Sequence, residues 1–424
     1  MCGIFGYVGK KSNAREKVIS GLKNLEYRGY DSWGIAAIDD TEKMVLVKKT
    51  GKISSVKLND LKSSMSFGHT RWATHGGVTD ENAHPHLDCS NDLALIHNGI
   101  IDNYEELKLN LPSEGHRFKS ETDSEVAVHL VEKFYDKFGF EKSVIKTFKS
   151  ITGLNAIIIM DRKTRLFAAV KNGSPLIIGR SQDGNYLASD AHAIIPYTRE
   201  LYFMEDGEMV IMGKSDIKII DLKKDMVKKG NFIKVNWNIS HADKGEQPHF
   251  MIKEIFDQEK IIEHILAAED SIIKKYSDLI SASFGTYLVG CGTAAYACLA
   301  GTYIFSKIAK VHVNFSVASE FGYLADFLTN KSLVIGLSQS GETIDLIDAL
   351  KKAKAKGVYI ASLVNVIGST LFRMSDSKLL LNAGVEQAVV STKAFTAKLA
   401  YLILIAYGIA GRLEDGKKLL KESV

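Results

Sequence analysis

The chain has little cysteine, no strong excess of charge of either sign and no long apolar run. Its four cysteines, at positions 2, 89, 291 and 298, lack the spacing of metal-binding or disulfide pairs. The net charge of +4, from 54 basic and 50 acidic residues, gives no reason to expect a nucleic acid as partner. No apolar run could span a bilayer and no signal peptide is recognisable, so we expect a cytoplasmic protein without membrane association.

The chain does have enough apolar residues for packed cores, 46% of 424. Up to about residue 235, short strand-like runs are punctuated by glycine, as at 4–8, 34–38, 44–48, 93–97, 156–160 and 166–170. Helices are expected at about 13–25 and from Thr122, where Thr122 and Glu125 form a capping-box pattern. This mixture predicts an α+β layered domain with largely antiparallel sheets over residues 1–235.

The patterning changes after a polar, aperiodic stretch at 236–250, which we interpret as a linker. From 251 to 424, buried-strand runs at 287–289, 311–315, 333–337, 359–364 and 379–381 alternate with helical patterns. This alternation predicts an α/β domain with a parallel sheet covered on both faces. Ligands bind outside the carboxyl ends of such strands, so the loops after Val289 and Leu337 are the candidate binding loops.

Cys2 is a candidate N-terminal nucleophile. Once Met1 is removed, the free α-amine of Cys2 can act as a base for its own thiol, whose reference pKa of roughly 8.5 lies close to that of the amine. Small shifts would then give a thiolate near neutral pH, and the thiolate is the form that attacks a carbonyl or carboxamide. We therefore predict that Cys2 is the catalytic residue of a thiol-dependent reaction.

Other residues of the first region would complete such a site. Asn98 and the following Gly99 offer an amide and a backbone N–H for an oxyanion hole. Arg71 can bind a carboxylate bidentately, and Asp123 can pair with an ammonium group. An α-amino acid carries both charges, so the set predicts attack on a side-chain amide, that is, glutamine hydrolysis or ammonia transfer.

Two polar loops in the second region resemble anion cradles. Gly290–Thr293 and Ser338–Thr343 each follow a strand and lead into a helix, where backbone N–H groups favour a negative charge. No lysine-bearing Walker pattern is present, which disfavours a nucleoside triphosphate. Two hydroxyl-rich loops without arginine predict a small sugar phosphate as ligand.

We expect no bound metal and no cofactor. Five histidines, at positions 69, 75, 84, 86 and 97, lack a His-x-x-x-His helix or a Cys-x-x-Cys pair, so structural hydrogen bonding is the better interpretation. Cys89, Cys291 and Cys298 are expected to be inert packing residues.

The motifs that carry a family resemblance run through essentially the whole chain. They are Cys2–Tyr7, Tyr27–Ser32, His69–Gly76, Asn82–Pro85, His97–Gly99, Glu121–Asp123, Gly173–Leu176, His249–Met251, Lys253–Ile255, Gly290–Thr293, Ser338–Thr343 and Ser391–Ala394. Together they resemble the glutamine:fructose-6-phosphate aminotransferase (isomerising) family, the glucosamine-6-phosphate synthases. The resemblance implies an N-terminal-nucleophile (class II glutamine amidotransferase) domain followed by a sugar isomerase (SIS) domain, acting on glutamine and fructose-6-phosphate.

Residue roles follow from the resemblance. It implies that Cys2 attacks glutamine through a γ-glutamyl thioester and that Trp72 gates an internal ammonia channel. The predicted glutamine-binding residues are Arg71, Thr74, His75 and Asp123. The predicted sugar-phosphate-binding residues are Thr293, Ser338, Gln339, Ser340, Thr343 and Ser391.

Some features depart from the family pattern. Trp33 stands where the family usually has a small residue, Ala294 where it often has serine, and Lys171 where it often has arginine. Residues 387–390 replace the family's usual Ile-Gly-Val-Ala run. The family also has a second SIS domain and a tail with a Schiff-base lysine, for which Lys393 is no safe substitute, and we expect both to be missing. Two alternatives therefore stay open: a glutaminase that only binds the sugar phosphate, or a non-catalytic hexose-phosphate sensor. We expect a homodimer.

Overall fold

The computed structural model describes residues 2–53, 62–236, 246–388 and 390–424. The chain separates into two compact units, Met1–Ile239 and Ser240–Val424. The predicted linker at 236–250 spans this division, but most of it lies outside the described residues. No helix of the described part is both long and apolar enough to cross a membrane.

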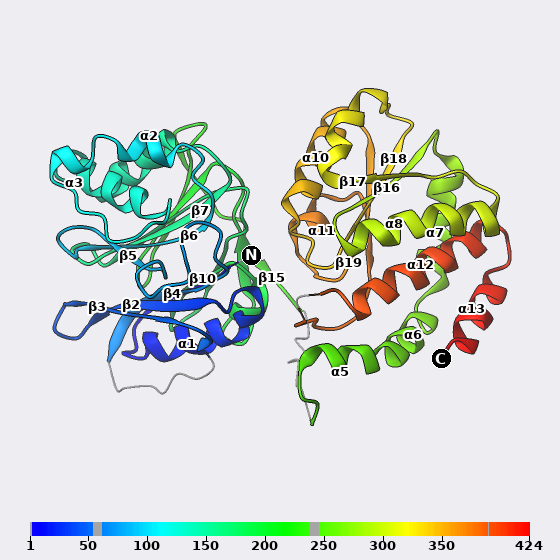
Figure 1. Cartoon of the computed structure of the whole chain (residues 1–424), viewed down its shortest axis with the longest axis horizontal. Helices are drawn as coiled ribbons and strands as arrows, with labels where there is room; N and C mark the ends of the chain where they lie inside the picture. Colours follow the sequence, from blue (N-terminus) through cyan, green and yellow to red (C-terminus); the bar gives the residue numbers. More distant parts are fainter. Residues whose placement is uncertain (1, 54–61, 237–245, 389) are drawn as a thin grey trace. The chain divides into compact units, whose positions relative to one another are not determined.

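The first unit contains two antiparallel sheets (Figure 1). An eight-stranded sheet has the order β15-β11-β9-β10-β1-β4-β2-β3, and a seven-stranded sheet has the order β14-β13-β12-β8-β7-β6-β5. The strands are β1 (Gly3–Gly9), β2 (Ser32–Asp39), β3 (Met44–Thr50), β4 (Ser63–Arg71), β5 (His86–Leu87), β6 (Leu93–Gly99), β7 (Asn155–Asp161), β8 (Leu166–Asn172), β9 (Ile177–Arg180), β10 (Gly184–Ala188), β11 (Glu200–Phe203), β12 (Glu208–Met212), β13 (Ile217–Asp221), β14 (Met226–Lys228) and β15 (Ile233–Lys234).

These sheets form the inner layers of a four-layer sandwich. Their facing sides share one apolar core, to which Ile4 on β1 and Ile158 on β7 belong. In Figure 1, α1 (Ala14–Asn24) covers the outer face of one sheet, and α2 (Tyr104–Lys108) and α3 (Glu125–Ser150) cover the other. The short helix α4 (Ala191–Ile194) packs with α1. The predicted α+β layered fold with antiparallel sheets is confirmed.

The capping box predicted at Thr122 is wrong. α3 begins at Glu125, and no side chain caps it. The Glu125 carboxylate instead accepts the N–H groups of Lys119 and Ser120 at 2.8 and 2.7 Å, while the Thr122 hydroxyl contacts His86 Nε2 at 3.0 Å. The capping box does not form because Glu125 binds the segment before the helix and Thr122 binds β5.

The second unit contains one five-stranded parallel sheet of order β17-β16-β18-β19-β20. Its strands are β16 (Thr286–Gly290), β17 (Asn314–Val317), β18 (Leu333–Ser338), β19 (Tyr359–Val364) and β20 (Ser377–Leu380). Its helices are α5 (Phe250–Phe256), α6 (Gln258–Leu266), α7 (Asp270–Ala282), α8 (Thr293–Ile304), α9 (Ala318–Phe321), α10 (Ile344–Ala355), α11 (Thr370–Met374), α12 (Lys393–Ile409) and α13 (Leu413–Glu422).

Helices cover both faces of this sheet. Leu288 and Ile335 face a core shared with α8 and α12, whereas Val289 and Val334 face a second core shared with α10. Neighbouring strand residues alternate between the two cores because successive side chains point to opposite faces. The predicted parallel α/β unit is therefore confirmed, although β17 begins three residues later than the predicted run at 311–315.

Candidate functional site

Cys2 lies directly before β1, beside the end of β4. β1 is paired on both sides, and Gly3 is opposite Thr70 of β4. The Trp72 N–H donates to Cys2 Sγ at 3.2 Å, and the thiol lies 3.6 Å from the Trp72 carbonyl oxygen. The predicted nucleophile is therefore a half-buried sulfur held against the turn that follows β4.

The surroundings of Cys2 do not by themselves favour a thiolate. Burial raises the pKa of the Cys2 thiol, and the Trp72 N–H and the nearby Arg71 offset this only in part. The α-amine that becomes free when Met1 is removed would thus have to take the thiol proton, as the N-terminal position of Cys2 predicts.

Asn98 lies next to the nucleophile at the end of β6. Its Nδ2 donates to the Cys2 carbonyl oxygen at 3.0 Å, and its Oδ1 lies 2.9 Å from His69 Nε2. Gly99 follows with φ of +137°, and a side chain there would put Cβ 2.0 Å from the Leu154 carbonyl oxygen. Asn98, one of the two residues predicted for the oxyanion hole, therefore contacts Cys2, and its amide is oriented by His69.

Arg71 is buried and has a structural role that the sequence did not reveal. Its guanidinium donates to the backbone carbonyls of His75, Gly76 and Gly77, and so holds the loop after β4. Burial lowers the pKa of Arg71, although Cys2 and Asp123 act to raise it, which places these three predicted site residues near one another.

The other predicted glutamine-binding residues lie around the same loops. Asp123 is buried, and its Oδ2 accepts the Ile101 N–H at 2.7 Å, which ties it to the segment after Asn98 and Gly99. Thr74 is exposed, and its Oγ1 lies 3.5 Å from Nδ1 of the half-buried His75.

Trp72, the predicted ammonia gate, has an exposed side chain. Its ring meets that of Tyr30 edge to face at a centroid distance of 5.5 Å. Asp31, beside Tyr30, accepts the Ala73 N–H at 3.0 Å. Asp31 was not predicted as a site residue; its only signal was its place in the motif Tyr27–Ser32.

Four of the five histidines, at positions 69, 84, 86 and 97, form a buried cluster, whereas His75 is half-buried beside Thr74. His84 contacts His69 at 3.3 Å, and its ring packs against that of His86 at 4.6 Å. His97 contacts Ser124 Oγ and Asn155 Oδ1, both at 2.7 Å. Burial lowers the pKa of His69 to about 3 and also lowers those of the other three, so the cluster stays neutral and makes the structural contacts that the sequence predicted.

Of the three cysteines predicted to be inert packing residues, Cys89 and Cys291 are not fully buried. Cys298 is fully buried in the core of the second unit, as predicted. Cys291 is only half-buried. The prediction for Cys89 is wrong: it is exposed and lies among polar groups, because the loop between β5 and β6 runs over the surface beside α3.

In the second unit, the two predicted cradles follow neighbouring strands. β16 and β18 are adjacent, and the chain leaves them toward opposite edges of the sheet, which makes their carboxyl ends a topological switch point. The loop after β16 contains Gly292, with φ of +54°, and the exposed Thr293 at the start of α8. The sheet order thus brings Thr293 and the loop Ser338–Thr343 to one edge.

The loop after β18 is tightly organised by its own hydroxyl groups. Ser338 Oγ accepts the Gly341 N–H at 2.9 Å and lies 3.2 Å from Thr343 Oγ1. Ser340 Oγ accepts the Glu342 N–H at 3.2 Å. At Gly341, φ is +66° and an added Cβ would lie 2.0 Å from Ser369 Oγ, so only glycine fits.

Ser391 belongs to a separate loop before α12. Its hydroxyl donates to Glu386 Oε2 at 3.3 Å, and the N–H groups of Thr392 and Ala394 donate to Glu386 Oε1. No contact in the described part joins Ser391 directly to Ser338, Ser340 or Thr343.

Asn365 connects the loop after β18 to Gly384, which lies shortly before Glu386 in the chain. Its N–H donates to the Gln339 carbonyl oxygen at 3.2 Å, and its Nδ2 donates to that of Gly384 at 2.7 Å. Glu254 was not predicted either; its Oε1 accepts the N–H groups of Gln387 and Ala388 at 2.6 and 3.0 Å.

Comparisons with known proteins first define a class. A glutamine amidotransferase domain model matches residues 69–196, and a SIS domain model matches residues 279–407. The chain is therefore a glutamine amidotransferase domain joined to a sugar isomerase domain, in agreement with the fold.

Whole-chain relatives define the family. Glutamine–fructose-6-phosphate aminotransferase [isomerizing] of Thermus thermophilus is 40% identical over 100% of this chain and 72% of its own length. The enzymes so named from Aquifex aeolicus and Pyrococcus horikoshii are 42% and 41% identical, over 72% and 69% of their lengths. The chain belongs to the glutamine–fructose-6-phosphate aminotransferase (isomerizing) family, an enzyme family.

Solved structures are also similar. Glutamine phosphoribosylpyrophosphate amidotransferase from B. subtilis is 19% identical with a TM-score of 0.48, covering 93% of this chain and 95% of that one. The C-terminal domain of the Francisella tularensis glucosamine-fructose-6-phosphate aminotransferase is 32% identical with a TM-score of 0.39, covering 43% and 56%.

Proposed function

We propose that the protein uses glutamine to aminate fructose-6-phosphate, forming glucosamine-6-phosphate and glutamate. The relatives bear this activity in their names. One observation in the chain carries the proposal: Cys2 Sγ accepts the Trp72 N–H at 3.2 Å while Asn98 binds the Cys2 carbonyl oxygen at 3.0 Å. A nucleophile and a candidate oxyanion donor thus meet at one strand end.

In the proposed reaction, the Cys2 thiol gives its proton to the α-amine, and the resulting thiolate attacks the glutamine side-chain carbonyl carbon. Asn98 Nδ2 and the Gly99 N–H stabilise the oxyanion. The α-ammonium then returns its proton to the leaving nitrogen, so collapse of the tetrahedral intermediate releases ammonia and leaves a γ-glutamyl thioester. Water then cleaves the thioester to glutamate. Arg71, Thr74, His75 and Asp123 would hold the α-substituents of glutamine.

The released ammonia would pass Trp72 and reach the sugar carbonyl without mixing with bulk water. Thr293, Ser338, Gln339, Ser340 and Thr343 would hold the phosphate of the sugar at the switch point between β16 and β18, where helix N-termini favour an anion. Ser391 would approach from its own loop. We also propose a homodimer, which light scattering would test.

The test is glutamine turnover by the purified protein with fructose-6-phosphate, measuring glutamate, free ammonia and glucosamine-6-phosphate together. Amino sugar formed in proportion to glutamate supports the proposal. Glutamate and free ammonia without amino sugar would reduce it to a glutaminase, and absence of glutamate would overturn it. The matched control is Cys2→Ala, which should form neither product.

A further inference from the structure

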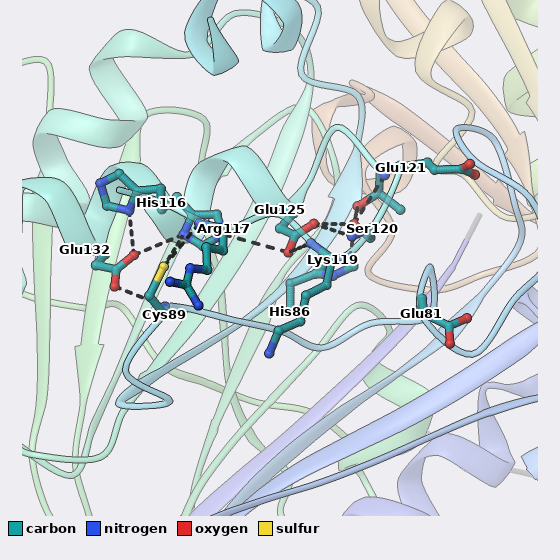
Figure 2. A network of polar contacts seen from close by, with 12 residues as sticks. Glu81, His86, Cys89, His116, Arg117, Lys119, Ser120, Glu121, Glu125 and Glu132 are labelled. Carbon is teal, nitrogen blue, oxygen red and sulfur yellow. Dashed lines mark hydrogen bonds and ion pairs between the residues drawn. The ribbon is translucent and has the colours of Figure 1, made fainter. Parts of the chain in front are cut away.

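Four side chains outside the glutaminase site converge on one point of the first unit. Cys89, His116, His129 and Glu132 each offer a ligand atom, and these atoms all lie within 4.8 Å of one another. Cys89 comes from the loop between β5 and β6, His116 from the segment before α3, and the other two from α3. Figure 2 shows His116, Glu132 and Cys89 turned toward one another at one end of a polar network.

We propose that these four residues bind a zinc-like divalent cation. Thiolate, imidazole and carboxylate are the three ligand types that Zn²⁺ takes in proteins, usually four in a tetrahedron. Metal–ligand bonds of about 2.0–2.3 Å place tetrahedral ligand atoms roughly 3.3–3.7 Å apart. The separation of 3.7 Å between Cys89 Sγ and His129 Nδ1 is close to this value.

Glu132 occupies the centre of the cluster. Its Oε2 lies 2.7 Å from His116 Nδ1 and 3.0 Å from His129 Nδ1, while its Oε1 accepts the Cys89 N–H at 3.0 Å. One carboxylate oxygen is therefore fixed by the backbone, and the other faces both rings and the sulfur. To reach the spacing of a coordinated cation, the two Glu132–histidine contacts would have to lengthen by a few tenths of an ångström, and the pairs that now lie up to 4.8 Å apart would have to approach.

Groups around the cluster suit the ligands. Glu125 Oε1 lies 3.8 Å from His129 Nε2, beyond hydrogen-bond distance, but this nearby negative charge favours a proton on Nε2 and so leaves the Nδ1 lone pair for a metal. The Arg117 N–H donates to Cys89 Sγ at 3.4 Å, a contact that favours the thiolate. The His129 side chain is fully buried, whereas Cys89 is exposed and gives a cation access.

Binding would exchange protons for the cation. Cys89 would release its thiol proton, and each histidine would present Nδ1 as a lone-pair donor with its proton on Nε2. All four positions would then be filled by protein, which is typical of a structural site rather than a catalytic one. The cation would fasten the β5–β6 loop and the segment leading to Asp123 onto α3.

The competing interpretation is a metal-free network of hydrogen bonds and ion pairs. Cobalt(II) distinguishes the two, since a thiolate bound to cobalt gives a charge-transfer absorption band. The titration uses the full chain carrying Cys2→Ala, because a free N-terminal cysteine could itself chelate the metal. We expect one cobalt per chain with this band, loss of the band in a further Cys89→Ser variant, and its retention in the matched Cys291→Ser variant.

Absence of the band before Cys89 is changed, or its persistence in Cys89→Ser, would overturn the proposal. Should Cys89→Ser not fold, Glu125→Gln serves instead: it should keep the band but weaken cobalt binding roughly 10- to 100-fold. Zinc should also raise the unfolding temperature of the chelator-treated protein, and no rise would count against the site. Because the Cys2→Ala background has no nucleophile, these results are independent of the proposed glutamine chemistry.

Discussion

The two units build their candidate sites in different ways. In the first unit, Cys2, Trp72 and Asn98 lie far apart in the sequence and meet through side-chain and backbone hydrogen bonds. In the second, one short loop, Ser338–Thr343, organises itself through its own hydroxyls and a glycine. The first site should therefore depend on single long-range partners, and the second on backbone conformation.

The largest effect is expected from Cys2→Ala. Without the thiol no covalent intermediate can form, so glutamate production should fall on the order of 10⁴-fold or more. Fructose-6-phosphate binding, measured by calorimetry, should stay within about twofold of the parent because the cradle lies in the other unit. Weaker sugar binding would show that the two sites are not separable in this way.

Acid should destabilise the first unit before the second. His69, with its pKa lowered to about 3 by burial, stays neutral in the folded protein while the unfolded chain takes up a proton below about pH 6.5. Stability is therefore lost progressively as the pH falls from about 6.5 to 3, by about 1.4 kcal/mol per pH unit for such a histidine. His84, His86 and His97 act in the same direction and outnumber His129 and His192, whose pKa values are raised by neighbouring carboxylates and which act in the opposite direction.

Tryptophan fluorescence measures this, since Trp33 and Trp72 lie in the first unit and the sequence after residue 245 has no tryptophan. Urea unfolding followed by fluorescence should shift to lower urea when the pH is lowered from about 7 to about 5.5. Helices of both units contribute to the circular-dichroism signal, so a circular-dichroism transition that shifts as far as the fluorescence transition would contradict the comparison.

Asn98→Ala should cost less than loss of the nucleophile. It removes the amide that binds the Cys2 carbonyl oxygen and the proposed oxyanion donor, so kcat for glutamine should fall about 10²- to 10³-fold. The KM for glutamine should change little. The matched control is Asn103→Ala, which removes an asparagine amide in the loop before α2 and should leave kcat unchanged. An unchanged kcat would remove Asn98 from the mechanism.

Gly341→Ala should be the smallest change, and it should act on the second unit. Its positive φ and the clash with Ser369 predict a loss of about 1–3 kcal/mol in unfolding free energy and weaker sugar-phosphate binding. Gly411→Ala has φ of +70° with open space around it, so it should cost only about 1 kcal/mol and leave binding unchanged. Urea unfolding and calorimetry measure the two effects, and equal losses in the two variants would show that the clash is relieved.

Much of the fold could be predicted from the sequence because each unit's strand pattern matches its sheet type. Residues 4–8 and 156–160 became strands of antiparallel sheets, and 333–337 became a buried parallel strand. The two loops after β16 and β18 were predicted as binding loops, but their adjacency in the sheet depends on strand order, which no single segment encodes.

Predictions failed where long-range partners replaced local ones. Thr122 bonds with His86 instead of capping α3, and Cys89 meets α3 residues instead of a core. Arg71 binds its own loop, a role that depends on where three carbonyl groups point. A sequence gives residue types but not these directions, so such roles emerge only from the three-dimensional structure.

The carboxylates of Glu254 and Glu386 have a kinetic consequence. They bind the backbone N–H groups of residues 387, 388, 392 and 394, so these described parts of the chain beside Ser391 are held by carboxylates of their own unit. A ligand reaching Ser391 would meet a surface with little conformational entropy left to lose. Its association rate should then follow the viscosity of the medium, as expected for an encounter limited by diffusion and not by closure of a loop.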